Sequence, residues 1–136
     1  MGDKEKIIVL RFAYWFGAIL DGLTFLMMIS PTLGGGIFSS NSINYDTSYH
    51  YANALGAPLM IGWTVLLIWA DRRPIERKEI ILITLFPVIT GLILANTTLY
   101  LIGISQMQEF LLRMIIQLIV VVILSFAYFI TKDIKS

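Results

Sequence analysis

Four long apolar stretches alternate with short polar segments along the chain. The stretches cover residues 7–30, 51–70, 80–104 and 110–130. An α-helix needs about 20 predominantly apolar residues to cross a bilayer, and each stretch meets that length. The pattern therefore predicts an all-α fold: a bundle of four transmembrane helices that forms a single integral membrane domain over residues 1–136.

The composition agrees with this pattern and excludes several other classes of protein. Hydrophobic residues make up 57% of the chain and charged residues 14%, and the mean hydropathy is +0.81. This leaves too little polar surface to cover a small soluble globule, so the lipid bilayer is the expected partner. A formal net charge of +1 provides no broad basic face for nucleic acid. With no cysteine, disulfides and thiolate metal sites are excluded.

The positive charges outside the stretches predict the orientation of the chain. Lys and Arg occur before the first stretch, in the turn at residues 71–79 and after the fourth stretch, whereas residues 31–50 and 105–109 contain none. The positive-inside rule then places both termini and the 71–79 turn in the cytoplasm. Residues 31–50, rich in Gly, Ser and Asn, are expected to form an irregular external loop.

Polar side chains inside the stretches are the candidates for function, because such groups persist in hydrocarbon when they are paired, face a wet cavity or carry a function. The candidate ligand-binding residues are Asp21, His50, Asn53, Asn96, Arg113 and Gln117. At a rise of about 1.5 Å per residue, these positions fall in the half of the bilayer away from the 71–79 turn. Arg11 lies nearer the cytoplasmic face, where a long side chain can reach the headgroups.

Helical spacing indicates how these polar groups meet. Asp21 shares a face of its helix with Tyr14, and Arg113 shares a face with Gln117. Asp21 and Arg113 are opposite charges at similar depth, so we predict an ion pair between them, with the amides of Asn53, Asn96 and Gln117 around it. Two interpretations stay open: the pair fixes which helices pack together, or it belongs to a polar pocket that opens outward.

Two further features have a bearing on structure and chemistry. Pro87 cannot donate a backbone hydrogen bond and is expected to kink the third helix, with Thr84 and Thr90 close enough to satisfy the freed carbonyls. The single His50 provides no set of metal ligands, so neither a metal nor a cofactor is expected.

Three functions are compatible with the pattern. The favoured one is binding of a small or lipid-like molecule in the outward-opening pocket, extended in one version to transport, with Asp21 pairing with the ligand or a proton. The second is a non-catalytic subunit that assembles with its own copies or with another membrane protein. The third is an intramembrane isomerase that uses Asp21, His50 and Tyr14. The absence of a nucleophile–base pair in the sequence favours a non-enzymatic function.

Three segments carry a resemblance to known families: residues 14–17 with Asp21 and Pro31, residues 62–69 and residues 72–78. Together they resemble a group of uncharacterised small four-helix membrane proteins of prokaryotes. This resemblance covers most of the chain; it implies a prokaryotic plasma membrane and no particular activity. Asp21, the last residue of the segment 17–21, is also similar to the membrane-embedded acid in the first helix of small multidrug resistance transporters. The present chain has Asp in place of Glu, a longer first loop and a one-sided charge distribution, so that similarity serves only as an analogy for a carrier.

Overall fold

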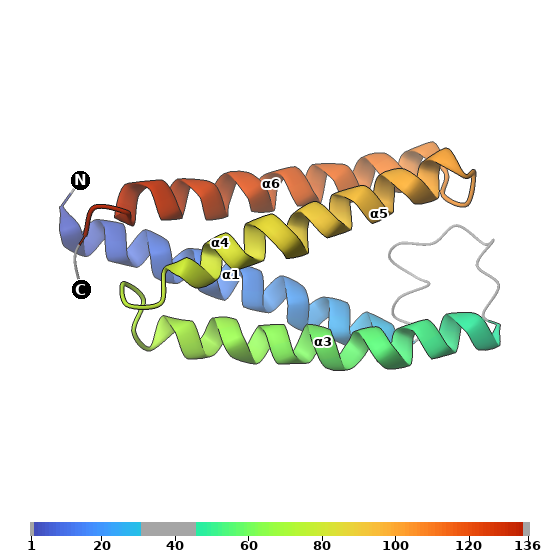
Figure 1. Cartoon of the computed structure of the whole chain (residues 1–136), viewed down its shortest axis with the longest axis horizontal. Coiled ribbons are helices and arrows are strands. Elements are labelled where there is room, and N and C mark those ends of the chain that lie inside the picture. Colours follow the sequence, from blue (N-terminus) through green and yellow to red (C-terminus); the bar gives the residue numbers. More distant parts are fainter. Residues whose placement is uncertain (1, 31–45, 135–136) are drawn as a thin grey trace. The chain divides into compact units, whose positions relative to one another are not determined.

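The computed structural model describes residues 2–30 and 46–134, and all regular elements in these ranges are helical (Figure 1). The elements are α1 (Asp3–Ile29), α3 (Thr47–Asp71), α4 (Glu79–Ile83), the π-helical turn η1 (Thr84–Ile89), α5 (Thr90–Leu101) and α6 (Met107–Thr131). Because α4, η1 and α5 follow one another without interruption, they form one span, Glu79–Leu101.

Within the described ranges, four helices are long and apolar enough to cross a membrane: α1, α3, the Glu79–Leu101 span and α6. The prediction of an all-α fold with four helices long and apolar enough to span a membrane is therefore confirmed. The cytoplasmic position of both termini stays a prediction. Most of the predicted external loop, residues 31–45, lies outside the described residues.

The helix ends differ from the ends of the apolar stretches for local reasons. α3 begins at Thr47 rather than at residue 51, because the Asp46 carboxylate accepts a hydrogen bond of 2.9 Å from the Tyr49 backbone N–H and so caps the helix. The third span ends at Leu101 rather than at residue 104, because Gly103 adopts a left-handed conformation with φ of 75°. Glycine accepts this conformation without steric cost, and it closes the helix.

The chain divides into two compact units. Unit 1 comprises Met1–Tyr14 and Ala70–Ser136, and unit 2 comprises Trp15–Trp69. Unit 1 thus holds the start of α1, the turn at residues 72–78, the third span and α6. Unit 2 holds the rest of α1 and nearly all of α3.

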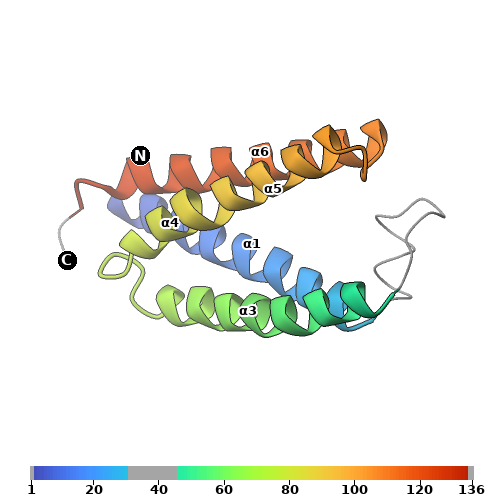
Figure 2. The same ribbon diagram turned by 45° about the vertical axis from the view of Figure 1, so that its right-hand side comes forward.

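In unit 1 the third span runs alongside α6, as both views show (Figures 1 and 2). The residues of α6 that are buried are Val120, Leu124, Ala127 and Thr131. Their spacing of four, three and four positions places them on one face of the helix. This stripe, together with Ile81 and Ile89 of the third span, forms part of the buried core. The polar residues of the third span and α6 are therefore carried on two helices that pack along this stripe.

The predicted kink at Pro87 takes the form of a π-helical turn over Thr84–Ile89. At its end, the Thr90 backbone N–H donates to the Leu85 carbonyl, five residues earlier. Hydrogen bonds between residues five apart accommodate Pro87, which has no backbone N–H to donate. The Thr84 hydroxyl donates to the Ile80 carbonyl at 2.8 Å, which is not the Ile83 carbonyl that Pro87 leaves without its donor, so the predicted role of the two threonines stays a prediction.

In unit 2 the second half of α1 packs closely against α3 through glycines. A Cβ atom added to Gly17 would lie 3.0 Å from the Leu67 side chain, and one added to Gly56 would lie 2.5 Å from the end of the Met28 side chain. Because Gly17 lies opposite Leu67 and Met28 opposite Gly56, the two segments run antiparallel. The missing side chains allow the two backbones to approach each other.

Candidate functional site

Two of the six candidate residues line one cavity in unit 2. The cavity has a volume of about 510 Å³, and His50 and Asn53 are its polar side chains. Its walls are otherwise apolar and come from both helices of the unit: Phe25, Met28, Ile29, Ala54, Ala57 and Pro58. The two polar residues stand out in the sequence, whereas the apolar walls do not, because these depend on how α1 packs against α3.

Pro58 removes one backbone hydrogen bond of α3 beside this cavity. It lies inside α3 and has no N–H, so it cannot donate to the carbonyl of Ala54 four residues earlier. Both residues line the cavity. The Ala54 carbonyl therefore lacks its usual helical donor, at a position close in sequence to His50 and Asn53. A proline inside an apolar stretch is the sequence signal that could have pointed to this missing bond.

Asp21 lies on α1, one helical turn before Phe25 of the cavity wall. Residues 21, 25 and 28 follow a spacing of four and three and so share a face of the helix, and Phe25 and Met28 line the cavity. The Asp21 residue is half-buried. Within the described part of unit 2, residues 15–30 and 46–69, no hydrogen bond or ion pair reaches its carboxylate. A half-buried carboxylate in this setting is costly unless it meets a ligand or a proton.

The other three candidates lie in unit 1, between α5 and α6. The Asn96 amide Nδ2 donates to the Phe110 carbonyl at 3.4 Å, which turns Asn96 toward α6. Arg113 and Gln117 follow Phe110 by three and seven positions and share its face. The structure thus brings Asn96, Arg113 and Gln117 to the same pair of helices.

The structure also identifies an acid that sequence reasoning missed. The Arg113 Nη2 lies 3.8 Å from the Glu109 Oε2, one turn away on the same helix. The apolar pattern places Glu109 in the connection before residue 110, but α6 begins at Met107, so Glu109 belongs to its first turn. The i,i+4 spacing of an acid and an arginine is the signal that could have revealed this contact.

Two amide oxygens in unit 1 are buried. Among the described residues, no donor reaches Asn96 Oδ1 or Gln117 Oε1. Buried polar atoms are nearly always hydrogen-bonded, so these two oxygens mark positions that favour a donor. Asp21, His50 and Asn53 belong to unit 2, whereas Asn96, Arg113 and Gln117 belong to unit 1. The Asp21–Arg113 ion pair and a pocket shared by all six residues therefore stay predictions.

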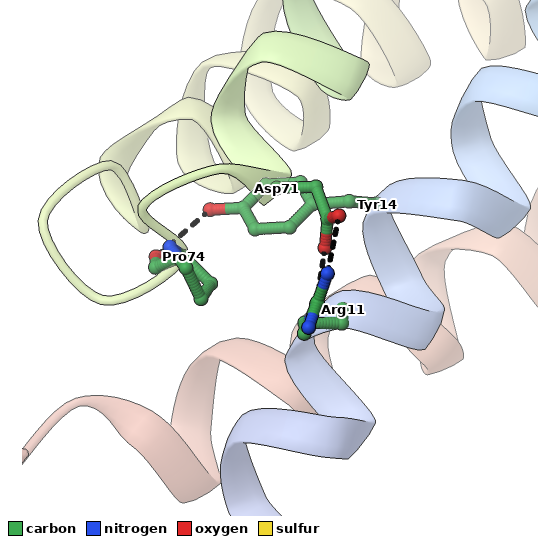
Figure 3. Close-up of polar contacts among 4 residues, drawn as sticks. All are labelled: Arg11, Tyr14, Asp71 and Pro74. Carbon is green, nitrogen blue, oxygen red and sulfur yellow. Dashed lines mark hydrogen bonds and ion pairs between the residues drawn. The ribbon is translucent and has the colours of Figure 1, made fainter.

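A second polar region lies in unit 1, where the start of α1 meets the 72–78 turn. The Arg11 guanidinium donates from Nε to Asp71 Oδ1 at 2.8 Å and from Nη2 to Asp71 Oδ2 at 3.0 Å (Figure 3). The Tyr14 hydroxyl lies 3.2 Å from the Pro74 carbonyl and 3.0 Å from the Arg77 carbonyl. Arg11 therefore does more than extend toward the headgroups, since it holds α1 to the end of α3.

The same turn is held to the end of α6 by Lys78. Its ammonium donates to the carbonyls of Thr131, Lys132 and Ile134 at 3.3, 2.7 and 3.1 Å. An ammonium has three donors, and all three are used here. A positive charge at the C-terminal end of a helix is also favourable for the helix dipole. The turn is thus fixed at both sides by charged side chains.

No protein-family model, curated protein or solved structure matches the chain. The fold defines the class as an all-helical protein with four helices that can span a membrane, counted over residues 2–30 and 46–134. Function is consequently inferred from the geometry of the two units.

Proposed function

We propose that this chain is a small membrane protein that binds a small or lipid-like molecule in the cavity of unit 2. The observation that carries the proposal is the composition of that cavity: mostly apolar walls with two polar side chains, His50 and Asn53. Its volume of about 510 Å³ lies within the range of about 300–1,000 Å³ that is typical of small-molecule sites. Such a site accepts a molecule with an apolar body and a single polar end.

The polar groups suggest how the ligand's polar end would be held. The Asn53 amide can both donate and accept, the ring nitrogens of His50 can form hydrogen bonds, and Pro58 supplies no helical donor to the Ala54 carbonyl. A hydroxyl, amide or amine on the ligand would satisfy them. By the positive-inside rule, the cavity would open on the side of the membrane opposite the 72–78 turn.

The Asp21 carboxylate is the second polar feature near the cavity. A carboxylate one turn below the cavity, on the same face as Phe25 and Met28, suits a cationic ligand group or a proton that accompanies the ligand. Transport by alternating exposure of the cavity is the extension of this proposal, because an acid such as Asp21 can exchange a proton for a cationic ligand in a proton-coupled carrier. Binding alone is the simpler form and is the one to test first.

The test is the composition of the purified full-length protein. We expect organic extraction followed by mass spectrometry to recover a molecule in fixed proportion to the wild-type chain. Asn53→Leu removes a polar group of the cavity while keeping similar volume, and Asp21→Asn removes the charge. We expect both variants to lose the molecule by at least about tenfold, since an unpaired polar end would remain on the ligand.

Thr24→Val is the matched control. Thr24 is exposed on α1, its hydroxyl bonds only to the Leu20 carbonyl of its own helix, and it does not line the cavity. This variant should retain the molecule. If Asp21→Asn fails to fold while Asn53→Leu keeps the molecule, Asp21 has a packing function and the ligand proposal fails. Recovery of no molecule from any variant would also contradict it.

A further inference from the structure

A second cavity, of about 590 Å³, lies in unit 1 beside the 72–78 turn. Three arginines line it: Arg11 from α1, and Arg72 and Arg73 from the turn. Three isoleucines, Ile7, Ile75 and Ile134, provide apolar wall. This cavity shares no residue with the cavity of unit 2, so a function for it is independent of the proposed ligand site.

The two carboxylates of this cavity do not use up the donors of its arginines. Asp71 accepts two of the five N–H groups of Arg11 through Nε and Nη2, and the Arg11 side chain is still 56% exposed. Glu76 accepts from Arg73 Nη1 at 3.1 Å, and both side chains of that pair are exposed. Several guanidinium donors therefore remain directed to the surroundings.

Arg72 has the least compensated charge of the three. It is exposed, and within the described residues 2–30 and 46–134 no hydrogen bond or ion pair engages its side chain. Asp71, its neighbour in sequence, is only 10% exposed at its side chain and already holds Arg11 in a two-pronged ion pair. The cavity therefore has three cations, two partly committed carboxylates and one uncommitted guanidinium.

The cavity lies where apolar helices end. α3 ends at Asp71, and α1 begins at Asp3, two turns before Arg11. Arginines at this level, beside the ends of apolar spans, are placed for the phosphates of lipid headgroups, while isoleucines beside them suit the glycerol and the first methylenes of the chains. Guanidinium groups bind phosphate oxygens with paired, charge-assisted hydrogen bonds.

The turn is also held in position before any anion binds. The Tyr14 hydroxyl bonds the Pro74 and Arg77 carbonyls, and Lys78 bonds three carbonyls at the end of α6. A fixed turn loses little conformational freedom on binding. The arginines of a mobile loop would have to be ordered at additional cost.

We propose that the cavity formed by Arg11, Arg72 and Arg73 binds the phosphate of an anionic phospholipid headgroup. The isoleucines favour a phosphate carried by a lipid over inorganic phosphate, because a free anion gains nothing from an apolar wall. Zwitterionic lipids carry a compensating ammonium and should bind more weakly at a site with an uncommitted cation.

The experiment is native mass spectrometry of the purified full chain in neutral detergent, titrated with phosphatidylglycerol or with phosphatidylcholine. The proposal predicts a saturable phosphatidylglycerol adduct that phosphatidylcholine does not match. Arg72→Gln should weaken the phosphatidylglycerol adduct by about fivefold or more, the change expected for one headgroup-level cation. Arg72→Lys should recover part of this loss, because it restores charge without the planar donor pair.

Lys4→Gln is the matched control, since Lys4 is an exposed cation on α1 that does not line the cavity. We expect it to change the affinity by less than about twofold. Equal losses of phosphatidylglycerol affinity in Arg72→Gln and Lys4→Gln would overturn the proposal. They would show that the lipid is attracted by the positive charge of the protein as a whole and not by this cavity. Equal adducts with the two lipids would overturn it as well. Displacement of the lipid by an equimolar concentration of inorganic phosphate would show a site for free anions and overturn the lipid assignment.

Discussion

At the residue scale, the contact between Arg11 and Asp71 shows how a largely buried carboxylate at the end of an apolar helix is paired with a cation. Asp71 ends α3 with its side chain only 10% exposed, and Arg11 supplies two hydrogen bonds to it from another helix. A buried carboxylate deprived of its partner retains its desolvation cost, whereas replacing both partners by apolar groups removes that cost. The pair therefore determines how the start of α1 joins the turn.

Our first prediction concerns this pair. Arg11→Met should lower the free energy of unfolding, because it removes the two hydrogen bonds that Arg11 donates to the largely buried Asp71 carboxylate. The double variant Arg11→Met, Asp71→Leu should recover more than half of that loss. Equilibrium denaturation of the purified chain in detergent measures both. Additive losses in the double variant would show that the two side chains do not interact.

The second prediction concerns Lys78. Lys78→Met keeps most of the unbranched side chain but removes three hydrogen bonds to the end of α6, and we expect it to lower the free energy of unfolding by about 1–2 kcal/mol. The lysine at position 132 provides the comparison, since it is exposed and contributes only its backbone carbonyl to this contact. Lys132→Met should change the stability by less than about 0.5 kcal/mol. The same denaturation measurement separates the two, and equal effects would contradict the contact.

At the element scale, the close approach of α1 and α3 depends on glycine. The Gly17 position leaves only 3.0 Å between an added Cβ and the Leu67 side chain, whereas Gly62 on α3 has nothing within 4 Å of an added Cβ. Glycine is otherwise a poor helix former, so its presence at Gly17 has a packing reason. Gly62 has no such reason in the described residues.

The third prediction follows from this contrast. Gly17→Leu should lower the free energy of unfolding by about 1–3 kcal/mol, because a larger side chain must force the helices apart or distort its own rotamer. Gly62→Leu should be neutral or stabilising by up to about 1 kcal/mol through helix propensity alone. Thermal unfolding followed by circular dichroism compares the two variants. A Gly17→Leu variant as stable as the wild type would contradict the observed packing of α1 on α3.

Elements were more predictable from the sequence than their contacts. Apolar length reports directly on the thickness of the bilayer, which is why the four spans were recovered. The ends were less predictable, because Asp46 extends α3 through a side-chain cap and Gly103 stops the third span through its backbone conformation. Pro87 indicated a departure from regular helix but not that a π-helical turn would absorb it.

The candidate site was predictable only in part, for a related reason. Polar side chains such as those of His50 and Asn53 can be chosen as candidates from the sequence, because placing them in hydrocarbon is costly. This criterion depends on the residue type alone and says nothing of the neighbours. The partner of each residue depends on which helix faces which, and for that reason the contacts of Arg11 with Asp71 and of Arg113 with Glu109 were missed.

At the scale of the whole molecule, the distribution of Lys and Arg leads to the fourth prediction. The chain contains no cysteine, so single cysteines report on sidedness without background. Gln106→Cys, in the exposed connection between α5 and α6, should react with a membrane-impermeant maleimide in intact cells. Glu76→Cys, in the exposed 72–78 turn, should react only after permeabilisation. The reverse pattern would place the termini outside and invert the expected opening of the ligand cavity.

The proposed function requires a cavity between α1 and α3, mostly apolar with two polar side chains, that a ligand can enter. The reactivity of two adjacent cysteines tests this most directly. Ala54 lines the cavity, whereas Leu55, its neighbour on α3, does not and is 57% exposed. Thiols react with charged methanethiosulfonates as thiolates, which requires water. We predict that Ala54→Cys reacts at least about tenfold faster than Leu55→Cys, whose thiol would face hydrocarbon. Equal rates at the two positions would contradict the cavity and, with it, the proposed function.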